Sequence, residues 1–406
     1  MIRADAAAAA RYENHMKYLK YLKIAIALEC ILITAASFYL TAGWQDGAGK
    51  GTRSAEEGAG QEAVSTGAGV KQDTRMPEAE RKGEALEIAK ADGGDYIKWV
   101  EFHAPEEALT TAYKLDVETY REDVHIGWID LLAYVAAKHG GQFPQGSVRE
   151  LEQTAQKLRD GDTTMEELTK ELQYFSYYQE AYTAILGGFV GEYQIQKKQE
   201  DGTLRWENCY GLKAFSPIAK GFYYEDYDDF GASRSYGYAR PHLGHDMMGQ
   251  VGTPIVAVES GYVEALGWNR YGGWRIGIRS FDKKRYYYYA HLRQNFPYNK
   301  QLEEKSVVTA GDVIGYMGHT GYSDKENVNN IKVTHLHWGL QLIFDESQKE
   351  GNNEIWIDCY QLTKFLYKNR CETVKDEETK EWHRVCGMKD PAAEAYRKGQ
   401  YRNAAN

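Results

Sequence analysis

Histidines and one aspartate recur at short spacings in the second half of the chain. The stretch "HLGHDMMGQVGTPIVAV" places His242 and Asp246 four residues apart, and "THLHWGLQL" places His335 and His337 two residues apart. Between them, "YYYYAHL" carries His291. Side chains alternate between the two faces of a β-strand, so residues two or four apart share a face. The spacing therefore predicts that two strands bring two imidazoles and a carboxylate to one point.

Two imidazoles and one carboxylate are a typical set of protein ligands for a catalytic zinc ion, with the fourth position open to water. Zinc lowers the pKa of a bound water to about 7, so hydroxide becomes available to attack a peptide carbonyl. A nearby histidine, with an ordinary pKa of about 6.5, is suited to accept the proton. No cysteine lies in this cluster and the chain has no C-x-x-C spacing, so a structural thiolate site is not expected.

The segment that carries these residues has the pattern of short β-strands. The stretches "TPIVAVESGYVEALGW", "WRIGIRS", "RYYYYAHL" and "DVIGYMG" alternate in polarity and are separated by glycine-rich turns. We expect a β-rich domain over residues 211–369 and a C-terminal extension over 370–406. The tail after Pro391 is polar, and we expect it to be poorly ordered.

Residues 95–200 have a helical pattern instead. Apolar residues recur at three- and four-residue steps from Val124 onward, and Gly140 supplies a helix stop. A later stretch begins near Thr163, which has the spacing of a capping box with Glu166. We expect a small all-α domain of four or five helices here. Its acidic residues show no paired-acid pattern of a glycosidase.

The N-terminal part predicts a membrane anchor. Residues 24–44 form an apolar run of the length that crosses a bilayer, interrupted only by Glu29. Basic residues in the preceding segment, 1–23, place this end in the cytoplasm and the rest of the chain outside. A cleaved signal peptide is the alternative, although Leu40 lacks the small side chain that cleavage favours. Residues 45–94 are poor in large apolar residues and predict a flexible linker.

Charge and cysteine content narrow the function further. The formal net charge is -10, and no basic stripe is present, so nucleic acid is not an expected partner. Four cysteines follow the apolar run, where disulfides can persist outside the cell. Cys371 and Cys386 flank a polar stretch that a bridge could close, but the sequence leaves the pairing of Cys209, Cys359, Cys371 and Cys386 open.

The order of the motifs resembles that of the lysostaphin-type (LytM-type) zinc metallopeptidases. The blocks "HLGHD", "GTPIVAVESGYV", "GWNRYGG", "YYAHL", "AGDVIGYMGHTG" and "HLHWGL" follow one another over residues 215–344, roughly a third of the chain. The resemblance implies a compact antiparallel β domain known as the duplicated hybrid motif. It also implies one Zn²⁺ ion and hydrolysis of peptide cross-links in bacterial peptidoglycan.

The resemblance also implies roles for single residues. His242, Asp246 and His337 fall on the family's zinc ligands. His335 falls on the histidine that acts on the water as general base. His291 falls on the histidine that orients the water or stabilises the tetrahedral oxyanion.

Two segments depart from the family pattern. The loop "SDKENVNNIKV" is longer than usual and Thr334 stands at a proline position, which leaves the choice of substrate open. The aromatic stretch "GFYYEDYDDFGASRSYGYAR" is also long and could shape or cover the cleft. Within it, Tyr236 and Tyr238 are candidates for polarising the intermediate. His245 lies between two ligands, and strand alternation predicts that it faces away from the site.

The sequence therefore predicts a multidomain, membrane-anchored, extracytoplasmic zinc metalloendopeptidase. A transmembrane helix, a small all-α domain and a mainly antiparallel β catalytic domain would follow one another. The expected partners are peptidoglycan peptide, the membrane through the N-terminal helix, and a protein that binds the helical domain. One alternative is a non-catalytic cell-wall scaffold or activator built on the same domain. Another is a latent enzyme whose cleft is blocked by its own segments.

Overall fold

The structure, a computed structural model, describes residues 96–235, 239–351 and 353–399. The expected membrane helix over residues 24–44 and the expected linker over 45–94 lie outside these ranges. Within the ranges that are described, no helix is both long and apolar enough to cross a membrane.

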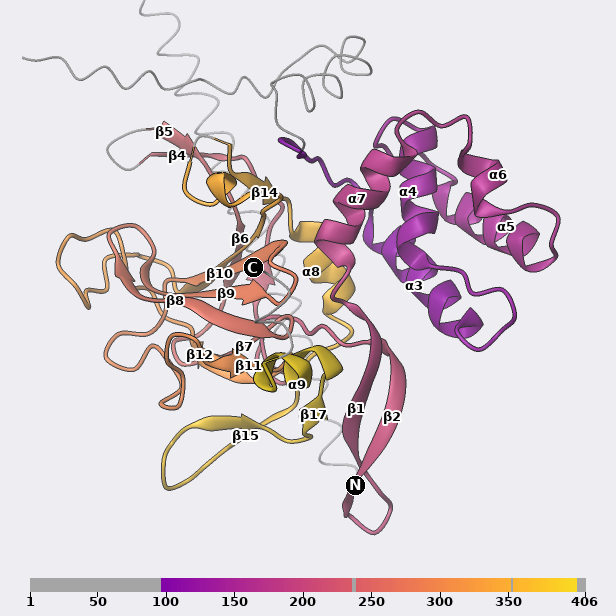
Figure 1. Ribbon diagram of the computed structural model, residues 1–406. Helices are drawn as coiled ribbons and strands as arrows, with labels where there is room; N and C mark the ends of the chain where they lie inside the picture. Colours follow the sequence, from indigo (N-terminus) through magenta and orange to yellow (C-terminus); the bar gives the residue numbers. More distant parts are fainter. Residues whose placement is uncertain (1–95, 236–238, 352, 400–406) are drawn as a thin grey trace, which may run out of the picture. The chain divides into compact units, whose positions relative to one another are not determined.

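Five helices follow one another in the first part of the described chain (Figure 1). They are α3 (Glu106–Thr119), α4 (Trp128–Lys138), α5 (Ser147–Arg159), α6 (Met165–Thr169) and α7 (Phe175–Leu186). The predicted apolar stripe of α4 is buried, with Leu131, Leu132 and Val135 fully inaccessible to solvent. Val124 precedes the helix and is 40% exposed, so it does not belong to the stripe. The small helical region is thus present where the periodicity predicted it.

Two details of this region differ from the prediction. The capping box lies one residue later than expected, because Thr164 rather than Thr163 accepts the backbone N–H of Glu167. The helical part also ends at Leu186 rather than near residue 200. Strands β1 (Val190–Lys198) and β2 (Leu204–Leu212) form an antiparallel hairpin there, since both alternate in polarity and pair over their full length.

The β-rich part is mainly antiparallel, as predicted. Its largest sheet has eight strands among the described residues, in the order β11-β8-β9-β10-β13-β6-β3, with β14 also paired to β13. Their bounds are β3 (Glu225–Asp226), β6 (His245–Met248), β8 (Gly261–Asn269), β9 (Gly273–Ser280), β10 (Arg285–Ala290), β11 (Val307–Val308), β13 (His335–Leu342) and β14 (Ile355–Ile357). Smaller pairs are β4 (Ser233–Ser235) with β5 (Ala239–Pro241), and β7 (Pro254–Val256) with β12 (Val313–Tyr316).

One face of the large sheet packs on the core. Tyr287 and Tyr289 of β10, and Leu336, Trp338 and Leu340 of β13, are completely buried. Residues between them point to the opposite face, because side chains alternate along a strand. Figure 1 shows β10, β9 and β8 side by side in this sheet. The alternation places the histidines of β13 on the face away from the core.

The C-terminal part is more ordered than expected. It contains a 3₁₀ turn (Glu346–Gln348), α8 (Tyr360–Leu366), β15 (Thr373–Lys375), β16 (Trp382–Arg384), β17 (Met388–Lys389) and α9 (Pro391–Arg397). The prediction of a poorly ordered tail after Pro391 was wrong for residues 391–397. Asp390 accepts the backbone N–H of Ala392 and Pro391 occupies the first turn, so both helix-starting signals are present.

The four cysteines that lie in the described ranges are free: Cys209, Cys359, Cys371 and Cys386. No bridge closes the stretch between Cys371 and Cys386 in the structure. Burial raises the pKa of the Cys371 thiol to about 11, so this thiol is protonated at neutral pH.

A buried ion pair joins the sheet to α7. Arg285 is 2% exposed; its Nε donates to Glu259 Oε2 at 2.7 Å and its Nη1 donates to the carbonyl oxygen of Ala184 at 2.8 Å. The Tyr287 hydroxyl donates to the same carboxylate at 2.5 Å. Gly188 is required beside them, because a Cβ there would lie 1.6 Å from Glu259 Oε1. The guanidinium thus satisfies both a buried acid and the end of a helix.

We expect Arg285→Met to lower the free energy of unfolding by about 3–5 kcal/mol, because it leaves Glu259 buried without its counter-charge. Urea unfolding followed by circular dichroism measures this. Lys197→Gln is the matched control, because it breaks the 2.8 Å ion pair between Lys197 and Glu207. The side chains of these two residues are 53% and 42% exposed. Such exposed pairs contribute about 0–1 kcal/mol. Equal losses in both variants would contradict a stabilising role for the buried pair.

Candidate metal centre

Three ligand atoms converge on one point. His242 Nε2 lies 3.0 Å from Asp246 Oδ1, His337 Nδ1 lies 2.9 Å from the same oxygen, and the two nitrogens are 3.0 Å apart. In the part of the chain that the structure describes, these residues are the one group of three or more that could hold a metal ion. Tetrahedral zinc, with bonds of about 2.0–2.2 Å, sets its ligand atoms about 3.3 Å apart. The triangle therefore fits the predicted zinc site.

Sheet register places two of these residues. β6 and β13 pair so that Asp246 lies directly opposite His337, and their side chains share one face. Gly244 allows this approach, because a Cβ at that position would lie 2.5 Å from the His337 ring. Asp246 and His337 are thus fixed by strands rather than by mobile loops.

The third residue, His242, follows β5 and is held by the segment before it. Its Nδ1 lies 3.2 Å from the carbonyl oxygen of Asp229 and 3.2 Å from the Oδ2 of the same residue. Its backbone N–H donates to Ala232 at 2.9 Å. A partner on Nδ1 orients the ring and leaves Nε2 for the metal.

Arg234 of β4 supports the same centre. Its Nη2 donates to Asp229 Oδ2 at 2.5 Å and to Asp246 Oδ2 at 3.3 Å. The second oxygen of Asp246 is therefore held away from the histidines, and Oδ1 faces them. Neither Asp229 nor Arg234 was identified from the sequence, because Asp229 is one of several acids in a row and only the fold of the β4–β5 hairpin selects it.

The electrostatics favour a cation. Burial raises the pKa of Asp246, but hydrogen bonds from His242 and His337 outweigh it and hold the pKa well below its usual range. Burial lowers the pKa of His337, against the opposing effect of Asp246. For His242, burial is outweighed by the bond to Asp246 and by the charges of Asp246 and Asp229, so its pKa is raised. An ionised carboxylate beside two imidazoles is a suitable donor set for zinc.

The two predicted catalytic histidines lie beside this triangle. His335 Nε2 is 3.7 Å from Asp246 Oδ1, and the ring centroids of His335 and His291 are 4.7 Å apart. His335 Nδ1 donates to the carbonyl oxygen of Val333 at 2.8 Å, and His291 Nδ1 donates to that of Thr320 at 3.0 Å. A carbonyl oxygen can only accept, so in each neutral ring Nε2 carries the lone pair. Both rings can therefore accept a proton or a hydrogen bond at Nε2.

His291 has an unusual backbone. Its φ is 61°, and its position is fixed by bonds from its N–H to Gly272 and from Gly318 to its carbonyl oxygen. Burial, together with the nearby His335 and His337, lowers its pKa well below the usual value. The strain is typical of residues that a fold holds in place for function.

The remaining sequence candidates fall outside the triangle. His245 is buried on the opposite side of β6, where its Nε2 lies 3.0 Å from Asp226 Oδ2 and it pairs with Trp338 in the register. Tyr236 and Tyr238 lie outside the described residues.

Tyr322 is a site neighbour that the sequence reasoning missed. Its ring stacks on that of His291 with centroids 6.0 Å apart, and its hydroxyl accepts from Arg240 Nη2 at 2.7 Å. The long loop after Tyr322 is held to β9 through Asn327, whose Oδ1 accepts a hydrogen bond from Trp274 Nε1 at 2.9 Å. No spacing rule marks Tyr322 among the 32 tyrosines of the chain, since only tertiary contacts bring it to His291.

Comparison with known proteins agrees with these observations. Residues 240–350 match peptidase family M23. The chain is 36% identical over 124 residues to the L-Ala--D-Glu endopeptidase of Bacillus subtilis (strain 168), which covers 30% of this chain and 36% of that protein. It is 39% identical over 83 residues to lysostaphin of Staphylococcus simulans, covering 20% and 16%. The chain thus spans 36% of the first relative and 16% of the second.

Solved structures are also similar. The catalytic domain of lysostaphin from Staphylococcus simulans aligns at 28% identity and a TM-score of 0.28, over 35% of this chain and 92% of that one. A candidate glycyl-glycine endopeptidase lytM from Ruminococcus gnavus ATCC 29149 aligns at 24% identity and a TM-score of 0.42, over 67% and 92%.

The family model and the sequence relatives confirm, for residues 240–350, the family resemblance indicated by the motifs. Residues 240–350 belong to peptidase family M23 and form a domain homologous to lysostaphin and to the L-Ala--D-Glu endopeptidase.

Proposed function

We propose that this chain is a membrane-anchored, extracytoplasmic zinc metalloendopeptidase that hydrolyses peptide bonds of bacterial peptidoglycan. The observation that carries the proposal is the triangle of His242, Asp246 and His337 with two further histidines beside it. The M23 relatives support it, since they are named as endopeptidases. All five positions are present, which favours a peptidase over a non-catalytic scaffold.

Each residue has a distinct part. His242, Asp246 and His337 would hold zinc, which when bound polarises a peptide carbonyl and lowers the pKa of water. His335 Nε2 takes the proton of the attacking water and later passes it to the leaving amine. Because His335 Nδ1 donates to the carbonyl oxygen of Val333, Nε2 keeps the lone pair that accepts this proton.

The family resemblance allows His291 either to orient the water or to stabilise the oxyanion. Its hydrogen bond to Thr320 decides between these two roles. Because Nδ1 donates to Thr320 and the ring is neutral, Nε2 is an acceptor and not a donor. An acceptor can orient the attacking water by receiving one of its hydrogens, whereas stabilising an oxyanion requires a donor. We therefore assign the orientation of water to His291.

We expect Asp246→Asn to lose zinc, because it removes the only charge among the three ligands. Mutating mere supporting partners of a ligand costs about 10–100-fold in metal affinity, so loss of the ligand itself should exceed that. Elemental analysis after dialysis, with a competing chelator, measures it. Asp226→Asn is the matched control, since Asp226 pairs with His245 on the opposite face of β6. Full zinc content in Asp246→Asn would overturn the ligand assignment.

His335→Ala separates binding from chemistry. We expect it to keep about one zinc per chain while the release of peptide fragments from isolated cell walls falls by about 10²–10⁴-fold. His383→Ala, at an exposed position of β16, should leave both unchanged. A wild-type protein that binds zinc but releases no fragments would instead support the non-catalytic scaffold.

Membrane anchoring rests on the apolar run over residues 24–44. We expect the full chain to stay with the membrane pellet through an alkaline carbonate wash, and a chain lacking residues 1–44 to move to the soluble fraction. The intact mass of the mature protein distinguishes an anchor from a cleaved signal peptide. Extraction of the full-length chain by carbonate would show that the run does not span the bilayer.

A further inference from the structure

The sheet face that carries the metal centre continues to an arginine. His337 pairs with Ala290 across β13 and β10, and Tyr289 pairs with Ile276 across β10 and β9. Arg275, next to Ile276, therefore lies on the same face as Ala290, one strand further from His337. Adjacent strands are about 4.8 Å apart, so Arg275 stands about 10 Å from His337 along the sheet.

The protein itself covers part of the sheet face between the two, since Ala290 is fully buried there. Ala290 lies between them, and Gly267 is paired with Arg275 on the far side. The ring of Tyr288 lies 5.9 Å from the His337 ring, and its hydroxyl accepts from Asn269 Nδ2 at 3.1 Å. On this part of the face solvent therefore reaches Tyr288 and Arg275, which are both half-buried, but not Ala290.

Arg275 has no acidic partner among the described residues. Its Nη1 is buried and makes no hydrogen bond to any of them. Arg279, four residues further on the same strand, differs: it forms ion pairs with Glu264 and Glu346. A buried guanidinium nitrogen without an acceptor is costly, and each such group requires an explanation. A bound carboxylate would supply the missing charge.

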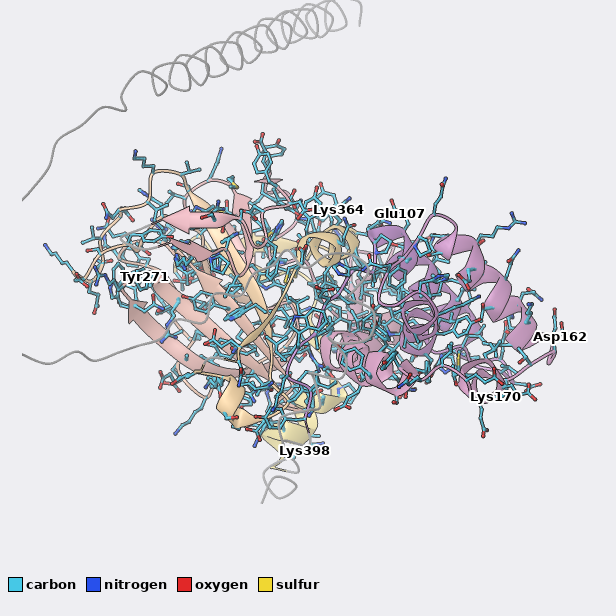
Figure 2. The ribbon with its side chains drawn as sticks, turned by 90° about the horizontal axis from the view of Figure 1, so that it is seen from above. Glu107, Asp162, Lys170, Tyr271, Lys364 and Lys398 are labelled. Carbon is cyan, nitrogen blue, oxygen red and sulfur yellow. The ribbon has the colours of Figure 1, made fainter. Side chains whose placement is uncertain are left out.

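A second arginine flanks the centre in the same condition. Arg240 of β5 donates from Nη2 to the Tyr322 hydroxyl, and its guanidinium lies 5.4 Å from the ring centre of Tyr271. Its Nε is buried and has no hydrogen-bond partner within the described ranges, where no carboxylate pairs with it either. Tyr271 lies in the turn between β8 and β9 and is marked in Figure 2. Tyr322 in turn stacks on His291, which connects Arg240 to the catalytic face.

Both positive charges act on the same neighbour. Burial raises the pKa of the Tyr288 phenol, while Arg275 and Arg240 oppose that rise. Tyr288 therefore lies within electrostatic reach of the two arginines and beside His337. The two guanidinium groups therefore both lie near Tyr288, although they come from different strands.

We propose that Arg275 and Arg240 form a carboxylate-binding subsite beside the metal centre, so that this chain selects peptides with a free carboxylate near the cleaved bond over neutral glycine bridges. The proposal rests on the peptidase function proposed above. An extended peptide rises about 3.3 Å per residue, so about 10 Å corresponds to at most about three residues from the cleaved bond. Arginine suits this role, because its planar fork binds a carboxylate through two parallel hydrogen bonds.

The test compares three synthetic substrates with the zinc-loaded full chain. One is a cross-linked dimer of stem peptides that carries D-glutamate, and the second is the same dimer with D-isoglutamine, in which a carboxamide replaces the free carboxylate. Pentaglycine is the third. We expect kcat/KM to be about ten- to a hundredfold higher for the carboxylate dimer than for the carboxamide dimer, as for a hydrogen bond to a charged group.

Variants locate the preference. Arg275→Gln and Arg240→Gln should each bring the ratio of the two rates toward one, and Arg275→Lys should keep part of it. Arg205→Gln, at an exposed position of β2, is the matched control for the lost charge and should keep the full ratio. Calorimetry with zinc-loaded His335→Ala protein gives a readout without turnover. There the carboxylate dimer should bind about tenfold or more tightly than the carboxamide dimer.

The outcomes are separable. Equal rates on both dimers, or an unchanged ratio in Arg275→Gln and Arg240→Gln proteins that keep their zinc, would overturn the subsite and leave the peptidase function standing. Hydrolysis of none of the three peptides by zinc-loaded wild type would overturn the peptidase function, and the subsite with it. If Arg275→Gln failed to fold, the Arg240→Gln ratio and the calorimetric difference measured with the His335→Ala protein would still decide.

Discussion

The pairing of β6 with β13 is the constraint on which the site depends, because it sets Asp246 directly opposite His337. The register is fixed by the other face of the same strand. Leu336, Trp338 and Leu340 are fully buried, and a slip of one residue would bring these three to the surface and turn His337 into the core. The apolar half of "HLHWGLQL" thus positions its polar half. Burial of the core and assembly of the metal centre are the same event.

The parts that support this centre come from less regular chain. Asp229 and Arg234 precede β6 in the segment that is longer than its family pattern, and both contact ligands of the predicted metal. Tyr322 opens the lengthened loop before β13 and stacks on His291. The strands therefore define where the candidate metal ligands meet, and the two unusual segments define what surrounds them. Such surrounding partners orient ligands and tune their basicity.

The sequence was sufficient where a local rule decides the outcome. Alternation correctly placed Asp246 and His337 on one face and His245 on the other. His242 joins them from outside β6, held by Asp229, so strand alternation does not account for its position. The sequence was insufficient where a distant partner decides. The position of Arg275 relative to the metal centre follows from the register of β9 against β10. The position of Asp229 follows from the fold of the β4–β5 hairpin. The tail helix α9 was not predicted, because the polar composition of the tail was given more weight than the helix-starting residues Asp390 and Pro391.

Charge balance explains how one face can attract both a cation and an anion. Asp229 and Asp246 carry two negative charges, and Arg234 offsets one of them, so the centre favours a divalent ion. Once that ion is present, the same group carries about one net positive charge and no longer repels a carboxylate. Arg275 lies about 10 Å from this centre. At that distance two unit charges interact with roughly 0.4 kcal/mol in water and about 1.7 kcal/mol at the lower dielectric of a protein surface. That distance exceeds the Debye length of about 8 Å at physiological salt, so the exposed part of the interaction is screened. In the proposed subsite, close contact with the arginines, rather than the electric field of the metal ion, would therefore decide which peptide is bound.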